Sequence, residues 1–175
     1  IMAFLDLEKY RDGLGLQQWR SLLAFGSGGL HGLGLGNGRQ KMNYLPEAHT
    51  DFIFAMVGEE FGLAGTTIVV VLFALLIIGG LLVAHRAEDR FGKLLAFGLI
   101  LMLGLEALMN MGVTTAVLPN KGLPLPFVSY GGSSLVAAML GVGILLNIHH
   151  QTSAANHGRL RTARRRMADR QAERR

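Results

Sequence analysis

Residues 63–84 read LAGTTIVVVLFALLIIGGLLVA, a run of 22 residues that contains no charged side chain. An α-helix rises about 1.5 Å per residue, so this run would be about 33 Å long as a helix. The hydrocarbon core of a bilayer is about 30 Å thick. The run therefore predicts a membrane-spanning helix.

Two further apolar runs follow it. Residues 94–118 form a run of 25 residues interrupted by Glu106 and Asn110, and residues 127–148 form a third run without any charge. Helices that are apolar on all sides need a large soluble core or a membrane to cover them. Three of them within 86 residues leave too little amphipathic sequence to provide such a core, so we predict an all-α membrane protein.

Composition and charge exclude some functions. The chain has 175 residues, half of them hydrophobic, with no Cys and a formal net charge of +5. Eight of its 17 Lys and Arg residues follow His149, so the basic character lies mainly in a tail, which argues against nucleic-acid binding. The chain opens Ile1-Met2-Ala3-Phe4 without the features of a signal peptide, and we expect it to be a piece of a longer protein.

The flanking charges predict the orientation of the spans. Arg86, Arg90 and Lys93 lie between the first two runs, whereas residues 119–126 carry only Lys121. The positive-inside rule then places the first connection and the C-terminus in the cytoplasm. The expected organisation is an extracytoplasmic loop over 1–62, spans over 63–84, 94–118 and 127–148, a cytoplasmic loop over 85–93, an extracytoplasmic loop over 119–126 and a basic cytoplasmic tail over 149–175.

The first 62 residues are too polar and glycine-rich to span. Apolar residues recur at helical spacing from Leu16 to Leu23, which predicts a short amphipathic helix over about residues 14–25. We expect this helix to float along the membrane interface with Trp19 among the headgroups. Residues 26–29, Gly-Ser-Gly-Gly, are expected to end it.

A second short helix is expected just before the first span. Thr50 is a suitable N-cap for a helix that begins at Asp51 and ends at Glu59 or Glu60. Gly62 would then open the span.

Several short motifs follow one another along the chain. They are Ser27-Gly28-Gly29, Gly32-Leu33-Gly34-Leu35-Gly36, residues 44–55 (YLPEAHTDFIFA), Gly58-Glu59-Glu60, residues 121–126 (KGLPLP) and residues 129–134 (SYGGSS). Together they resemble the successive signatures of the SEDS family (shape, elongation, division and sporulation) over residues 1 to about 148. The resemblance implies a ten-helix fold, of which this chain would supply the large extracytoplasmic loop and the last three transmembrane helices.

The resemblance also implies a function. Glu47-Ala48-His49 and Asn120-Lys121-Gly122 are more similar to the division branch than to the elongation branch, although an elongation-type or sporulation-type member stays open. Division-type members are peptidoglycan glycosyltransferases that polymerise lipid II in septal cell-wall synthesis. They join the 4-hydroxyl of one disaccharide to the anomeric carbon of another, with inversion and loss of lipid diphosphate.

Asp51 corresponds to the catalytic carboxylate of the family. A carboxylate in the first turn of a helix is kept ionised by the helix macrodipole, and it can take a proton from the sugar hydroxyl in the transition state. From spacing alone, Asp51 is more simply a favourable residue for a helix start. The resemblance to the family favours the catalytic role for Asp51 over the purely structural one.

The expected substrate-binding residues lie in the two outer segments. Lys121 can hold a phosphate or anchor at the headgroups, and a helix start after Pro126 offers free amides to an anion, although Gly131 and Gly132 also suit tight helix packing. The glycine alternation from Gly32 is interpreted as loop architecture. The full expected set is Glu47, His49, Lys121, Ser129, Tyr130, Gly131, Gly132 and Ser133, with Ser27 and Gly28.

No metal site is predicted. Glu47, His49 and Asp51 alternate, but two or three ligands rarely suffice, so no cofactor is certain and a divalent cation such as Mg²⁺ is left open as an aid to diphosphate departure. Glu106 and Asn110 lie one turn apart within the second run, and we expect a structural hydrogen bond between them or a position facing a polar cavity.

Two other classes of function compete with the polymerase. A lipid II flippase or other transporter would depend on Glu106 and Asn110, whereas a scaffold that recruits a transpeptidase would tolerate loss of Asp51. By resemblance, the expected partners are lipid II, lipid-linked glycan, a class B penicillin-binding protein and divisome proteins, with no nucleic acid. The expected location is the bacterial inner membrane at the division septum, as a multi-pass protein.

Overall fold

The computed structural model describes residues 15–36 and 51–172, and it describes side chains as far as residue 154. These residues form helices and no strand. The helices are α2 (Leu16–Gly28), α3 (Ile53–Arg86), α4 (Arg90–Thr114) and α5 (Gly132–Ala172). Three of them have segments long and apolar enough to cross a membrane, namely Ile53–Arg86, Arg90–Thr114 and Gly132–Ala154. The predicted all-α membrane fold with three spans is confirmed.

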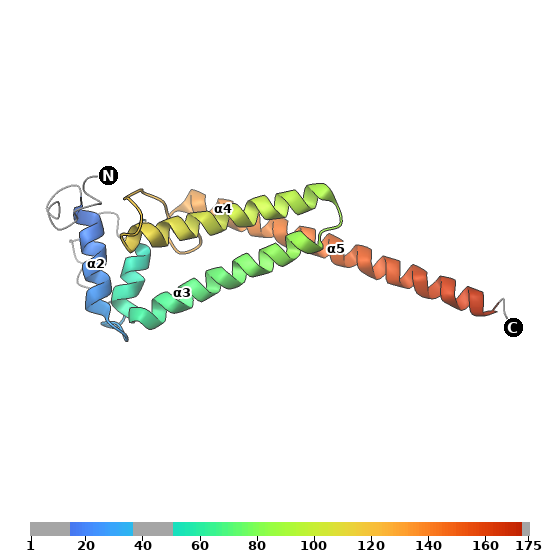
Figure 1. Ribbon diagram of the computed structural model, residues 1–175, viewed down its shortest axis with the longest axis horizontal. Coiled ribbons are helices and arrows are strands. Elements are labelled where there is room, and N and C mark those ends of the chain that lie inside the picture. The colour runs from blue at the N-terminus through green and yellow to red at the C-terminus, as the bar shows by residue number, and fades with distance from the viewer. Residues whose placement is uncertain (1–14, 37–50, 173–175) are drawn as a thin grey trace.

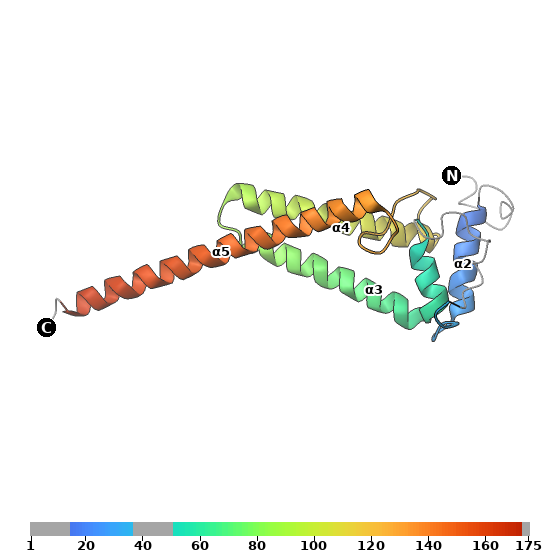
Figure 2. The ribbon, with the colours of Figure 1, turned by 180° about the vertical axis from the view of Figure 1, so that it is seen from behind.

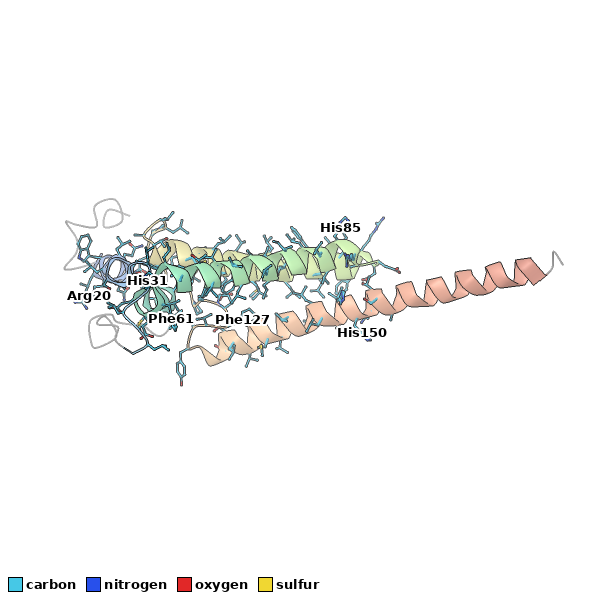
Figure 3. All side chains as sticks on the ribbon, turned by 90° about the horizontal axis from the view of Figure 1, so that it is seen from below. Arg20, His31, Phe61, His85, Phe127 and His150 are labelled. Atoms are coloured by element: carbon cyan, nitrogen blue, oxygen red, sulfur yellow. The ribbon has the colours of Figure 1, made fainter. Side chains whose placement is uncertain are left out.

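The three long helices run side by side and separate two ends of the molecule. α3 and α4 form an antiparallel pair joined by a short turn, and α2 crosses the end of this pair that lies away from the turn (Figure 1). α5 crosses the pair from behind, in the direction of α3, and continues past the turn (Figure 2). His85 and His150 therefore lie near the turn, whereas Arg20, His31 and Phe127 lie at the other end (Figure 3). We call this other end the loop end.

Capping interactions set the bounds of α4, which lies four residues earlier than the predicted span over 94–118. The Asp89 carboxylate accepts a hydrogen bond from the Gly92 N–H and caps the helix start. At the C-terminus Ala116 has a φ of 55°, and the Val117 N–H donates to the Gly112 carbonyl over 2.8 Å. This left-handed turn is a Schellman motif, which ends the helix.

α5 also differs from the predicted span over 127–148. It begins at Gly132, because residues 125–131 form a turn before it, and it extends through the predicted tail to Ala172. The tail is therefore helical over most of its length.

α3 contains a break at Gly62, where φ is 65° and ψ is −159°. This conformation separates a short helix from the long apolar one, and it lies where the sequence predicted the change. The predicted helix start is wrong, however. α3 begins at Ile53 with Phe52 at the N-cap and no side-chain cap from Phe52, so Asp51 precedes the helix; Thr50 lies outside the described residues. The Asp51 carbonyl accepts a hydrogen bond from the Asn110 side chain, while the amides of Ala55 and Met56 donate to the Phe52 carbonyl.

The glycine loop over residues 29–36 pairs the main-chain groups that the break leaves free. The Leu33 and Gly34 amides each donate over 3.0 Å to the carbonyls of Glu59 and Glu60, and the Leu63 amide donates over 2.9 Å to the Gly29 carbonyl. These groups would otherwise be unpaired helix ends. The contact explains the glycines, because a Cβ on Gly32 would lie 2.1 Å from the Glu60 carbonyl oxygen. The geometry agrees with the interpretation as loop architecture.

α2 packs on the protein through a face that combines polar residues with Ala24, which is buried, and Phe25, whose ring contacts that of Phe54. Gln18 and Ser21 are buried, and Leu23 is 46% exposed. The Gln18 side chain donates to the Leu118 carbonyl over 2.7 Å, and the Ser21 hydroxyl donates to the Thr114 carbonyl over 2.6 Å. The expectation that this helix floats is therefore wrong, because it is docked on the protein, whereas its place along the membrane interface stays a prediction. The free carbonyls at the end of α4 need donors, and α2 supplies them.

Apolar contacts hold the long helices together at both ends. One cluster at the loop end joins Phe54, Phe73, Ala107 and Leu125, and a second near the turn joins Ala84, Ala96, Ile100 and Leu145. The first cluster includes residues from the segment before α5, so it fixes that segment against α3 and α4.

We expect Gly62→Ala to destabilise the full-length protein. The backbone conformation at Gly62 is essentially restricted to glycine, and an added Cβ would lie 2.5 Å from the Gly32 nitrogen. Strain at such a position costs about 1–3 kcal/mol. The measurement is the melting temperature of the purified protein in detergent. Gly79→Ala is the matched control, because nothing lies within 4 Å of a Cβ there, and equal melting temperatures for the two variants would contradict the expectation.

Candidate functional site

Asp51 and Gly122, which are far apart in sequence, meet at the loop end. Asp51 is half-buried in the turn before α3, and its Oδ2 lies 2.6 Å from the position that a Cβ on Gly122 would occupy. The carboxylate thus occupies the space that the glycine leaves open. The two outer segments predicted from the sequence are therefore in contact.

The Asn110 carboxamide holds these two segments in place. Asn110 lies on α4 and is 1% exposed. Its Nδ2 donates to the Asp51 carbonyl over 2.8 Å and to the Leu123 carbonyl over 2.6 Å. Both donors of one side chain are used, one on each segment.

This arrangement corrects the prediction for Glu106. The expected hydrogen bond between Glu106 and Asn110 is not formed, because the Asn110 amide is engaged by the two main-chain carbonyls, and its Oδ1 accepts nothing from the described part of the chain. Glu106 is half-buried on α4. Asn110 is the member of this pair for which the described structure shows hydrogen bonds to the segments that bear the predicted site.

Lys121 is exposed directly beside Gly122. The connection that carries it is fastened to α2, since Asn120 Nδ2 donates to Gln17 Oε1 over 2.8 Å. A cation is thus carried next to the residue that the Asp51 carboxylate contacts. Both predicted roles for Lys121, phosphate binding and headgroup anchoring, are compatible with its exposure.

Ser129 closes a tight turn ahead of α5. Its hydroxyl accepts a hydrogen bond from the Leu125 N–H over 2.7 Å, and its own N–H donates to the Leu125 carbonyl over 3.0 Å. The turn holds Phe127 at a φ of 65° and directs its ring to the cluster on α3 (Figure 3). A small apolar cavity of about 160 Å³ lies between this turn and α3, and its lining includes Phe73 and Phe127.

The rest of the SYGGSS motif forms the start of α5. The Gly131 carbonyl accepts from the Leu135 N–H and from the Ser134 hydroxyl, both over 3.0 Å. Tyr130 is 85% exposed, and Gly132 and Ser133 are exposed in the first helical turn. Exposed residues, one of them with a hydroxyl, therefore form this helix start, and anion binding there stays a prediction.

Ser27 and Gly28 lie in contacts that build the fold. The Ser27 hydroxyl donates to the Ala24 carbonyl over 2.9 Å, and a Cβ on Gly28 would overlap the Gly58 carbonyl. The amides of Leu33 and Gly34 are also occupied, as described above. Glu47 and His49 lie outside the described residues.

Metal binding was left open by the sequence. Among the residues that the structure describes, no group of three or more His, Asp or Glu side chains could hold a metal ion. A cation bridging Asp51 would need ligands from elsewhere.

Sequence reasoning missed the structural roles of Asn110, Gln18 and Ser129. An Asn within an apolar run signals a functional or structural role, because a polar group in the membrane needs a partner. That signal identifies Asn110, but the partners are main-chain carbonyls, which carry no sequence signature.

Comparison with protein families gives one clear match. The model of the FtsW/RodA/SpoVE family, described as "Cell cycle protein", matches residues 1–154. Two similar relatives are each named "Probable peptidoglycan glycosyltransferase FtsW". The one from Geobacter metallireducens is 53% identical over 148 residues, covering 85% of this chain and 40% of the relative. The one from Coxiella burnetii is 50% identical over 155 residues, covering 87% and 42%.

Two solved structures resemble the fold. One, described as "Structural coordination of polymerization and crosslinking by a peptidoglycan synthase complex", has a TM-score of 0.71 at 31% identity, over 86% of this chain and 40% of that one. An aspartate-to-alanine variant of the rod shape determining protein RodA from Thermus thermophilus has a TM-score of 0.58 at 34% identity, over 75% and 40%. The chain spans about two fifths of the length of the curated relatives described above.

We expect Ser129→Ala to destabilise the full-length protein by about 1–3 kcal/mol, because the buried Leu125 N–H loses its acceptor. The measurement is again the melting temperature in detergent. Ser133→Ala is the matched control, since Ser133 is exposed in the first turn of α5. A Ser133→Ala variant that melts as low as Ser129→Ala would show that the turn is not the cause.

Proposed function

The chain belongs to the FtsW/RodA/SpoVE family of cell cycle proteins, and on that basis we propose that it acts as part of a peptidoglycan glycosyltransferase that polymerises lipid II. The observation that carries the proposal is the contact of the Asp51 carboxylate with Gly122, beside the exposed cation Lys121. A base and a phosphate-binding group are the two chemical elements that this reaction needs.

In the proposed reaction, Asp51 acts as the general base. Its carboxylate takes the proton of the acceptor 4-hydroxyl while the oxygen attacks the anomeric carbon of the donor. The bond from that carbon to the lipid diphosphate breaks, the configuration inverts, and the proton passes from Asp51 to solvent. Removing a proton in the transition state contributes about 10²–10⁴-fold to a rate.

Two groups at the same end of the molecule as the base would stabilise the departing diphosphate. Lys121 supplies a compact positive charge, and the exposed first turn of α5 at Gly132 and Ser133 supplies amides that favour an anion. Gly122 supplies space, because any side chain there would displace Asp51. A divalent cation such as Mg²⁺ would assist the same step but is not required by these residues.

The proposed orientation places the loop end outside the cytoplasmic membrane. Arg86, Arg90 and Lys93 lie at the turn end, and the basic tail extends beyond it. The positive-inside rule therefore favours a cytoplasmic turn and C-terminus. Asp51 would then face lipid II headgroups at the outer surface of the bacterial inner membrane.

Within the family we propose a role in cell division. The relatives described above are named FtsW, and the Glu47-Ala48-His49 and Asn120-Lys121-Gly122 motifs favour the division branch. A structural neighbour is described as a peptidoglycan synthase complex that polymerises and crosslinks. We propose by analogy that this protein works at the septum with a class B penicillin-binding protein and other divisome proteins.

We expect Asp51→Asn to lower lipid II polymerisation at least about 100-fold, because the amide cannot accept the proton. The assay uses the full-length protein with its transpeptidase partner and purified lipid II, and glycan chains are separated on gels. Glu106→Gln tests the transporter alternative, and polymerisation should stay within about twofold of wild type, since the hydrogen bonds to the site segments come from Asn110 and not from Glu106. Near-normal synthesis by Asp51→Asn would refute the proposed base.

We expect Gly122→Ala to lower the polymerisation rate at least tenfold in the same assay, because its Cβ would lie 2.6 Å from Asp51 Oδ2 and displace the carboxylate. Displacement of a reacting group by about 1 Å can cost about 100-fold. Gly98→Ala on α4 is the control, since nothing lies within 4 Å of a Cβ there. Equal rates for the two variants would mean that close approach to Gly122 is unimportant.

A further inference from the structure

Asn110 is the buried polar residue that links the two segments of the site. Its Nδ2 donates to one main-chain carbonyl on each segment, those of Asp51 and Leu123. Leu123 directly follows Gly122, so the two hydrogen bonds fix the distance between Asp51 and Gly122. Both hydrogen bonds join neutral groups, so the link between the two segments does not depend on an ion pair.

We propose that Asn110 is the positioning residue for the Asp51 carboxylate, an assignment that rests on the proposed role of Asp51 as the base. Asn110 does not touch substrate in this assignment. It acts through the main chain of Asp51, by holding the turn before α3 against the connection that carries Lys121.

The chemistry of the site requires a carboxamide at this position. Asn presents two N–H groups on one nitrogen, which matches two carbonyl acceptors. Asp has the same shape but presents acceptors to the carbonyls when ionised, and Gln keeps both donors on a chain that is longer by one methylene. Asn110→Asp therefore tests the loss of the two N–H donors, whereas Asn110→Gln tests a change in side-chain length with the donors kept.

A chain of hydrogen bonds continues from Asn110 to α2. The Asn110 carbonyl accepts from the Thr114 hydroxyl over 2.9 Å, and the Thr114 carbonyl accepts from the Ser21 hydroxyl over 2.6 Å. Thr114 and Ser21 are both fully buried. The end of α4 that carries Asn110 is thereby fixed against α2, so the carboxamide is anchored to a rigid part of the fold.

The first test measures steady-state polymerisation by the full-length protein with its partner, for Asn110→Asp, Asn110→Gln and Asp51→Asn. For Asn110→Asp we expect kcat to fall at least tenfold with KM for lipid II within about twofold, and for Asn110→Gln we expect a smaller loss. Asn147→Leu is the control, because Asn147 is exposed on α5 near the opposite end, and it should keep wild-type kinetics.

The second test measures how closely residues 51 and 122 approach each other, and it does not depend on enzyme activity. This chain contains no Cys, so Asp51→Cys with Gly122→Cys can be introduced into a full-length protein freed of other cysteines. Oxidation in membranes should join the two cysteines in a disulfide. Free thiols are then labelled with a maleimide polymer, which shifts the protein on a gel, so a crosslinked protein is recognised by the loss of this shift. Adding Asn110→Asp should lower the crosslinked fraction at least threefold, and adding Asn110→Gln should lower it by a smaller factor. Adding Asn147→Leu should not change the crosslinked fraction.

Each pattern of results decides the assignment. Parallel losses of kcat and of crosslinking across the two Asn110 variants support it. Retained crosslinking with lost activity, or lost crosslinking with retained activity, overturns it. If Asn110→Asp does not assemble, the Asn110→Gln variant decides by the same comparison. Should Asp51→Asn stay active, the proposed base fails, whereas an inactive Asp51→Asn with a normal Asn110→Asp rejects the positioning role alone.

Discussion

Main-chain groups at the ends and breaks of membrane helices must find hydrogen-bond partners, and the loop end of this structure depends on that constraint. Water is scarce near the hydrocarbon region, so unpaired amides and carbonyls are costly there. The glycine loop over residues 29–36 pairs the groups freed by the break at Gly62, and Gln18 and Ser21 pair the carbonyls at the end of α4. These contacts supplement the apolar cluster around Phe54 in joining the segments at the loop end.

The candidate site is a consequence of the same constraint. Asn110 pairs its amide with carbonyls of the two segments that lack helical partners, and Ser129 closes the turn that leads into α5. Asp51, Gly122 and the start of α5 are thereby given defined positions by neutral hydrogen bonds. The hydrogen bonds that Asn110 makes to Asp51 and Leu123 go to main-chain carbonyls, so this link does not use the Asp51 carboxylate.

α2 shows how far sequence reasoning reaches. Its existence follows from apolar residues at helical spacing. Its docking face, however, includes the polar residues Gln18 and Ser21 beside Phe25, because part of the partner surface is a set of free carbonyls. The helix start near Asp51 shows a similar limit. Thr50 suits an N-cap, yet the Asp51 carbonyl is bound by Asn110 from another helix, and the helix begins at Ile53. Local signals compete with tertiary hydrogen bonds that lie far away in sequence.

The sequence by itself determined the three spans, the break near Gly62, the family and the residues that bear the proposed chemistry, because long apolar runs and dense motifs are local properties of the chain. Only the tertiary structure decided that the Asp51 carboxylate lies against Gly122, that Asn110 joins the two segments, and that α2 docks by Gln18 and Ser21. The physical reason is that these contacts are made to main-chain atoms. Every residue has such atoms, so the choice of partner depends on how the helices pack.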